Sequence, residues 1–204
     1  IPKLVSARQD LLQRGMHLRD AVDVLLRDTM SSSHVRIRPT ILLGPSGAGK
    51  SALATSFGEA MGVPTKLFGL GGASDSSVGG TSAQWASARE NGVLQFIQQS
   101  RVANPLIIFD EVDKASADRR NGSVFDALLV LLERDQARTF HDPALEVSCD
   151  LSHVNYVLTA NVISDVPTPL RDRCRIIKVF EPKWEHIAPI VERMIVDIAQ
   201  QRQV

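Results

Sequence analysis

Residues 40–51 read TILLGPSGAGKS, and this stretch decides the fold. It begins with a short, mostly apolar run, Thr40–Leu43, which predicts a buried strand. The glycine-rich segment Gly44–Ser51 follows at once, and residues 51–61 are rich in Ala, Leu and Glu, as is typical of a helix. A strand, a glycine-rich turn and a helix in this order form the context in which the pattern G-x-x-x-x-G-K-[ST] binds phosphate.

The segment Gly44–Ser51 is therefore predicted to be a phosphate cradle. Glycines let the backbone turn successive N–H groups inward, and the N-terminus of the following helix adds positive charge. Lys50 is expected to neutralise the β- and γ-phosphates of ATP, and the Ser51 hydroxyl is expected to bind Mg²⁺. The whole cradle is Gly44, Pro45, Ser46, Gly47, Ala48, Gly49, Lys50 and Ser51. A dinucleotide-binding fold is disfavoured, because G-x-G-x-x-G does not occur here.

A second signal is the run Pro105–Val112, PLIIFDEV, in which a continuous apolar stretch ends in two acids. Such a run is expected of a central strand that is buried on both faces. Asp110, at the carboxyl end, is expected to bind Mg²⁺, and Glu111 to activate the attacking water as a general base. Alone, the run is equally compatible with a strand that reaches solvent. Beside a phosphate cradle it favours ATP hydrolysis over the phosphorylation of a small molecule.

Composition disfavours several other classes of protein. The chain has 204 residues, 44% of them hydrophobic, which is enough for a real core. Lys and Arg together number 23, as do Asp and Glu, so no global basic field favours a nucleic-acid partner. No apolar run approaches the roughly 18 residues of a membrane span. The two cysteines, Cys149 and Cys174, lie far apart, which fits a reducing cytoplasm better than a disulfide framework or a zinc site.

Strands and helices alternate along the rest of the chain, which predicts an α/β fold with a mostly parallel sheet between helices. One or two helices are expected over residues 4–29, and a final amphipathic helix over residues 184–201. The remaining expected strands are residues 65–70, 155–160 and 175–180, the remaining helices are residues 92–102 and 124–133, and a short hairpin is expected over residues 139–147. Residues 71–80, GGASDSSVGG, have the composition of a loop.

Together these motifs resemble the AAA+ ATPases, P-loop NTPases whose large subdomain is a sheet of five parallel strands flanked by helices. Within that family the likeness is to the ATPase module of Lon-type proteases, over about residues 41–180. It is carried by the runs 109–114 (FDEVDK), 139–152 (TFHDPALEVSCDLS) and 166–173 (VPTPLRDR). The chain departs from the family at residues 89–92 (RENG) and 119–123 (RRNGS).

The resemblance implies three more site residues. Asn161, which follows the strand 155–160, matches the first sensor of the γ-phosphate, although a strand-end Asn that caps a turn is the alternative. Arg173 matches the arginine finger that acts on a neighbouring subunit, with Arg171 and Arg175 as competitors. Trp85 falls where a pore loop carries the aromatic residue that grips a polypeptide, although it could instead anchor a loop on the core. Residues 15–18 are expected to lie near the adenine.

The resemblance also implies a division of the chain and a function. Residues 1–38 are an N-terminal helical segment and linker, residues 39–183 are the nucleotide-binding core, and residues 184–204 are a helix leading to a small subdomain outside this chain. The expected function is ATP hydrolysis with Mg²⁺ that drives polypeptide unfolding or translocation in a homo-oligomeric ring, a hexamer. The alternative is a nucleotide-dependent scaffold or DNA-associated switch that threads nothing.

Overall fold

The computed structural model describes residues 2–70, 91–115 and 124–201. In chain order the elements are α1 (Pro2–Arg14), η1 (Met16–Leu18), α2 (Arg19–Thr29), β1 (Thr40–Leu43), α3 (Lys50–Met61), β2 (Thr65–Gly69), α5 (Gly92–Ser100), β3 (Leu106–Asp110), η2 (Val112–Lys114), α6 (Val124–Leu132), α7 (Arg134–Ala137), β4 (Phe140–Asp142), β5 (Val147–Cys149), β6 (Asn155–Ala160), η3 (Ile163–Asp165), α8 (Thr168–Arg173), β7 (Arg175–Lys178) and α9 (Trp184–Gln201). The helices and strands expected from the sequence are all confirmed, and their ends differ by only a few residues.

A parallel sheet of five strands forms the centre of the molecule, in the order β2-β3-β6-β1-β7. The strand β1 lies between β6 and β7, and β3 lies between β2 and β6, so the strands that precede the cradle and the acidic pair are both internal. All six residues of β6 are buried. Because parallel strands all end at the same edge, the residues that follow β1, β3 and β6 are brought together there.

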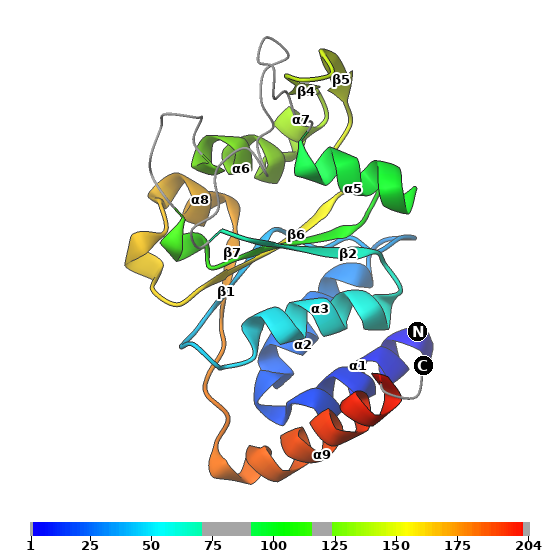
Figure 1. Cartoon of the computed structure of the whole chain (residues 1–204), viewed down its shortest axis with the longest axis vertical. Helices are drawn as coiled ribbons and strands as arrows, with labels where there is room; N and C mark the ends of the chain where they lie inside the picture. Colours follow the sequence, from blue (N-terminus) through cyan, green and yellow to red (C-terminus); the bar gives the residue numbers. More distant parts are fainter. Residues whose placement is uncertain (1, 71–90, 116–123, 202–204) are drawn as a thin grey trace.

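Helices cover both faces of the sheet (Figure 1). Neighbouring residues of β3 pack into hydrophobic cores on opposite faces. Ile107 packs with α5, α6 and α8 on one face, whereas Ile108 packs with α1, α2 and α3 on the other. Both side chains are fully buried, as the continuous apolar run predicts. The first two helices therefore share a core with the cradle helix α3.

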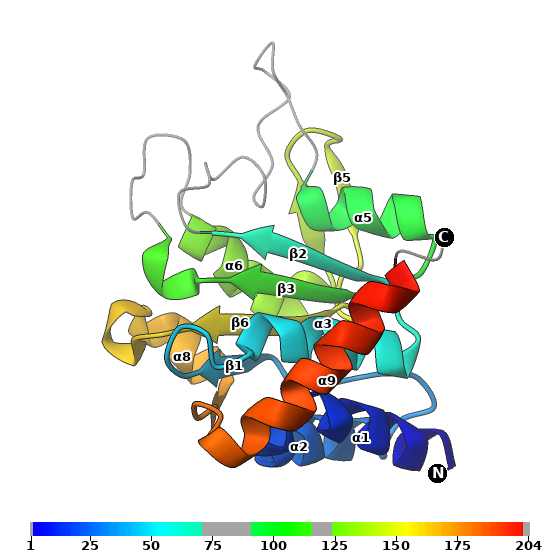
Figure 2. The ribbon, with the colours of Figure 1, turned by 60° about the horizontal axis from the view of Figure 1, so that its bottom comes forward.

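The last helix, α9, lies across α1 on the outside of this second layer (Figure 2). It follows an extended segment after β7, and Trp184 at its start is 84% exposed. The antiparallel hairpin β4–β5 stands at the opposite end of the molecule. Among the described residues, no helix combines the length and apolarity needed to cross a membrane.

Candidate functional site: a phosphate cradle at the edge of the sheet

The cradle connects β1 to α3, and its backbone has the conformation that the glycines predict. Gly47 and Gly49 have φ of 81° and 86°, in the left-handed region that favours glycine. Gly44 is required for a different reason, because a Cβ there would lie 2.0 Å from the carbonyl oxygen of Val179. Since α3 begins at Lys50, its free N–H groups face the cradle.

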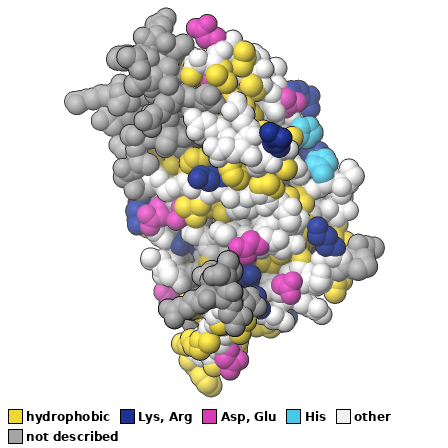
Figure 3. Space-filling view, turned by 45° about the vertical axis from the view of Figure 1, so that its right-hand side comes forward, with side chains coloured by type: hydrophobic (Ala, Val, Ile, Leu, Met, Phe, Trp, Pro, Cys, Tyr) yellow, Lys and Arg dark blue, Asp and Glu magenta, His cyan; other side chains and the backbone are white. Residues whose placement is uncertain are grey.

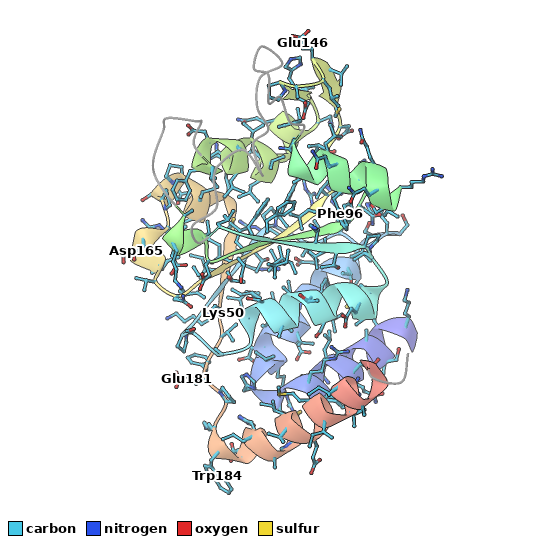
Figure 4. The ribbon with its side chains drawn as sticks, viewed as in Figure 1. Lys50, Phe96, Glu146, Asp165, Glu181 and Trp184 are labelled. Carbon is cyan, nitrogen blue, oxygen red and sulfur yellow. The ribbon has the colours of Figure 1, made fainter. Side chains whose placement is uncertain are left out.

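Lys50 is folded into the cradle and is only 7% exposed (Figure 4). Its Nζ donates hydrogen bonds of 2.8 Å to the carbonyl oxygens of Gly44 and Pro45 and to Oδ1 of Asn161. Burial lowers the pKa of Lys50, while the nearby carboxylates of Asp113, Asp110 and Glu111 act to raise it. The ammonium group thus sits among oxygen acceptors, at the place where the cradle would receive phosphate.

Two hydroxyl groups converge on Asp110 at the end of β3. Ser51 Oγ donates to Asp110 Oδ1 at 2.5 Å, and Thr159 Oγ1 donates to the same oxygen at 2.6 Å. A carboxylate and a hydroxyl are the hard oxygen ligands that Mg²⁺ prefers, so Ser51 and Asp110 fit the metal that the sequence predicts. They line a cavity of about 340 Å³ together with Lys50, Glu111 and Asn161.

Glu111 stands directly after the strand in a strained backbone conformation. Its φ and ψ are 58° and 49°, a left-handed conformation that costs a non-glycine residue about 1 kcal/mol or more. Its N–H donates to Thr159 Oγ1 at 2.9 Å, and its carboxylate pairs with Lys114 Nζ at 2.5 Å. Strain of this kind persists where the surroundings enforce it, and here the acidic side chain that carries it lines the cavity beside Lys50.

Asn161 follows β6 and lies beside the acidic strand end, as the parallel sheet requires. Its side chain accepts from Lys50, and its backbone N–H donates to Asp113 Oδ2 at 2.9 Å. The sequence did not single out Thr159, although its hydroxyl joins Asp110 to the backbone of Glu111. Its one signal in the sequence is a hydroxyl residue directly after the apolar residues 157–158, and in the structure it is only 1% exposed.

A second cavity, of about 320 Å³, adjoins the other side of the cradle. It is mostly apolar and is lined by Leu11, Arg14, His17, Leu18, Gly47, Ala48, Gly49, Ala52, Leu53, Ser56, Pro182, Ile190, Arg193 and Met194. His17 Nε2 lies 3.2 Å from the Ala48 carbonyl oxygen, and the His17 ring stacks on His186 with 5.7 Å between centroids. Residues 15–18 are thus next to the cradle, and α9 closes the far wall.

Arg173 is not brought to the cradle of its own chain. It lies two residues before Arg175, the first residue of β7, which pairs with Thr40 at the start of β1, whereas the cradle follows the end of β1. The sheet therefore separates them by about 13 Å or more, the length of four residues of strand. Arg173 instead lies 3.6 Å from Glu133 and donates to the Pro169 carbonyl at 3.1 Å.

The two competing arginines are engaged locally. Arg175 makes a bidentate ion pair with Asp28 at 2.8 and 2.9 Å, and Arg171 donates to Thr168 Oγ1 at 2.6 Å. Trp85 and the loop 71–80 lie outside the described residues.

Comparison with known protein families gives a match over residues 40–182 to the ATPase family associated with various cellular activities (AAA). A Lon protease of Mesomycoplasma hyopneumoniae is 40% identical over 179 residues, which are 87% of this chain and 20% of that protein. The mitochondrial Lon protease homolog of Mus musculus is 36% identical over 158 residues, 77% of this chain and 16% of that protein. This chain thus spans about a fifth of the length of these curated relatives.

Among solved structures, Hsp104 in a closed state with ATPγS and FITC casein has the same fold. The TM-score is 0.73 at 20% identity, and the match covers 97% of this chain and 39% of that one. The fold class and the resemblance to Lon-type ATPase modules are confirmed by these matches.

Proposed function

The chain belongs to the AAA family of ATPases, and from this premise we propose that it binds Mg·ATP in the cradle and hydrolyses it. The observation that carries this proposal is the convergence of Ser51 and Thr159 on Asp110, directly beside Lys50. The groups needed for a phosphate, a divalent cation and an attacking water thereby share one cavity.

Phosphate binding follows from the contacts of Lys50. Its ammonium group now donates to two backbone carbonyls and to Asn161. A triphosphate offers charged acceptors, which form shorter and stronger hydrogen bonds than neutral carbonyls. We expect Lys50 to turn to the β- and γ-phosphates while the N–H groups at the start of α3 hold the phosphate oxygens.

The metal site uses Ser51 and Asp110. When bound, Mg²⁺ would neutralise charge on the β- and γ-phosphates and lower the barrier to phosphate release. The Ser51 hydroxyl would then turn from Asp110 to the cation, and Thr159 would keep the Asp110 carboxylate in place.

Glu111 is the proposed general base. Its ion pair with Lys114 is half exposed, with side chains 40% and 52% accessible, and an exposed pair of this kind contributes little to stability. The carboxylate can therefore leave Lys114 at small cost and take a proton from water aligned with the γ-phosphate. Asn161 would sense the same phosphate through its amide.

The apolar cavity at His17 and Leu18 is the proposed site of the adenine. It adjoins Gly47–Gly49, so a base placed there would lie on the side of the cradle away from Asp110. Since Ile190 and Met194 of α9 form one wall, nucleotide binding would also fix the position of that helix.

We further propose that the module works in a homo-oligomeric ring, a hexamer, that moves a polypeptide. The position of Arg173 supports this, because about 13 Å or more of sheet separates it from the cradle of its own chain. The relatives are named Lon proteases, and a solved neighbour is an Hsp104:casein complex. Trp85 is the proposed residue that grips the polypeptide.

A scaffold or DNA-associated switch remains the second candidate. On the face in Figure 3, the basic side chains of the described residues stand apart from one another, so that this part of the surface offers DNA no continuous positive patch. Replacing Trp85 with Ala separates the two functions, because a threading motor would keep ATP turnover and lose the ability to unfold a tagged protein.

We also propose a cytoplasmic location for the protein.

The direct test of the cradle is Lys50→Ala. We expect the affinity for Mg·ATP, measured by calorimetry, to fall by at least about 100-fold, since a buried charge-assisted contact is lost. Lys66→Ala, which changes a lysine on β2 away from the cavity, is the matched control. Unchanged ATP affinity in Lys50→Ala would contradict the assignment of the cradle.

A further inference from the structure

Asp113 joins the turn that carries Glu111 to the loop that carries Asn161. It lies in η2, immediately after β3, and its Oδ2 accepts two backbone hydrogen bonds, from Asn161 N at 2.9 Å and from Val162 N at 3.0 Å. Both amides come just after the end of β6, where the ladder to β3 has stopped. One carboxylate oxygen thus supplies the acceptor that the sheet no longer provides.

This contact continues to the cradle through Asn161. The backbone of Asn161 is held by Asp113, and its side-chain Oδ1 accepts from Lys50 Nζ at 2.8 Å. Lys50 in turn donates to the carbonyls of Gly44 and Pro45. An unbroken series of hydrogen bonds therefore runs from the turn at the end of β3 to the floor of the cradle.

The other oxygen of Asp113 indicates that the carboxylate is not placed for stability alone. Oδ1 is buried and has no hydrogen-bond partner among the described residues. A buried, unsatisfied carboxylate oxygen is costly and is retained where a site requires it. The Asp113–Lys114 pair also belongs to the run FDEVDK that carries the family resemblance, yet the proposed chemistry uses only Asp110 and Glu111 from that run.

We propose that Asp113 is a positioning residue for ATP hydrolysis, which fixes the backbone of Asn161 relative to the turn of Glu111. The inference rests on the proposed function, because Asp113 does not contact the nucleotide itself and acts only through Asn161 and Glu111. Asn161 and Glu111 then approach the γ-phosphate as one unit, and a shift of either loop is passed to the other. Removing the carboxylate leaves the cradle intact and misplaces the sensor.

The experiment compares Asp113→Ala, Asp113→Asn and the control Asp150→Ala. Asp150 is a suitable control because it also accepts a backbone hydrogen bond, from Ser152 N at 2.9 Å, on an exposed loop. We expect Asp113→Ala to lower ATP turnover by on the order of 100-fold, as for a misplacement of about 1 Å, with Mg·ATP affinity changed less than about threefold. Asp113→Asn keeps one acceptor oxygen, so its ATP turnover should lie between that of Asp113→Ala and that of the unchanged chain.

Two further measurements make the outcome decisive. The first is the affinity for Mg·ADP with aluminium fluoride, which mimics the transition state and needs no turnover; it should fall in Asp113→Ala while Mg·ATP affinity does not. The second is a double-mutant cycle with Asn161→Ala. When Asp113→Ala is added to Asn161→Ala, ATP turnover and the affinity for the fluoride complex should each fall by less than about threefold.

The possible outcomes separate the inference from the proposed function. Full affinity of Asp113→Ala for the fluoride complex would overturn the inference, as would additive losses in the cycle, which would mean that Asp113 acts elsewhere. An Asn161→Ala variant without any loss would instead overturn the proposed role of the sensor. If Asp113→Ala does not fold, the same two measurements on Asp113→Asn decide the question, with an intermediate loss expected.

Discussion

Thr159 Oγ1 donates a hydrogen bond of 2.6 Å to Asp110 Oδ1 and accepts one of 2.9 Å from the backbone N–H of Glu111. A single hydroxyl on β6 therefore holds both acidic residues at the carboxyl end of β3, Asp110 and Glu111. The threonine is 1% exposed, so water cannot replace either contact without a rearrangement.

We expect Thr159→Val to lower both stability and turnover. Valine has nearly the same shape but leaves the Glu111 N–H and one Asp110 contact unsatisfied, at a cost of about 1–3 kcal/mol in the free energy of unfolding. Urea unfolding measures this cost, and phosphate release at saturating Mg·ATP measures turnover. Thr159→Ser retains the hydroxyl and should preserve most of both. Equal stability and turnover in Thr159→Val would show that the hydroxyl is dispensable.

Gly44→Ala should destabilise the cradle through its backbone neighbour. The new Cβ would lie 2.0 Å from the Val179 carbonyl oxygen, so β1 and the segment after β7 must move apart. Overpacking of this kind costs about 1–3 kcal/mol, which thermal unfolding would register as a lower midpoint. The matched control is Gly69→Ala, where a Cβ meets nothing within 4 Å. A Gly44→Ala variant as stable as the control would contradict the packing described here.

The parts of the site that sequence predicts are those encoded locally. Gly44–Ser51 is recognisable because strand, turn and helix are contiguous, and Asp110 because it ends an apolar run. Thr159 and Asp113 are different, because their roles depend on the pairing of β3 with β6. That register brings together residues 48 or 49 positions apart in the chain, which neither composition nor periodicity reveals.

The positions of His17 and Arg173 likewise depend on contacts between distant parts of the chain, which the sequence alone does not reveal. The contact of His17 with Ala48 spans 31 residues and depends on how α1 and α2 pack against α3. Arg173 lies at the amino-terminal end of the strands, opposite the cradle, because β7 pairs with β1. The alternation of helices and strands in the sequence does not determine this strand order. Family resemblance suggested the role of Arg173, and the topology, which places it away from the cradle of its own chain, is the reason we propose that it acts on another subunit.

Glu111→Gln is expected to trap bound ATP. The amide cannot accept the proton from water, so turnover should fall by about 100-fold or more, while the cradle contacts of Lys50 are untouched. Calorimetry and single-turnover phosphate release distinguish binding from chemistry.

Glu146→Gln is the control for Glu111→Gln, because Glu146 also has a left-handed backbone, with φ of 55°, at the hairpin β4–β5. Figure 4 shows it at the far end of the molecule from Lys50. It should keep full turnover. Normal turnover in Glu111→Gln would reject Glu111 as the base.

Arg173→Ala should abolish the dependence of turnover on protein concentration. If a finger from one subunit completes the site of the next, specific activity rises as rings assemble, and loss of the finger costs on the order of 1000-fold. Arg171→Ala, which removes a local bond to Thr168, should have a small effect. A large loss in Arg171→Ala with none in Arg173→Ala would exchange the two roles.

Mixing variants tests whether Arg173 acts in trans. Arg173→Ala retains the base Glu111, and Glu111→Gln retains the finger Arg173, so mixed rings contain some sites with both. Each variant alone should be inactive, and an equal mixture should recover part of the turnover. No recovery, with mixed rings demonstrated by cross-linking, would mean that the arginine does not complete a neighbour's site.

Acid should loosen the wall of the apolar cavity through His17. Burial lowers the pKa of this imidazole from its ordinary value of 6.5; the hydrogen bond to the Ala48 carbonyl opposes this shift in part, and nearby His186 adds to it. As the pH falls below about 6.5, the unfolded chain takes up the proton more readily than the folded one, so stability is lost down to the folded pKa and then levels off. His17→Gln, whose amide can still donate to Ala48, should lose less stability between pH 7.5 and 5.5 in urea unfolding than the unchanged chain. His34→Gln, which replaces an exposed histidine in a loop, is the control. An equal loss of stability on acidification in all three proteins would exclude His17 as the cause.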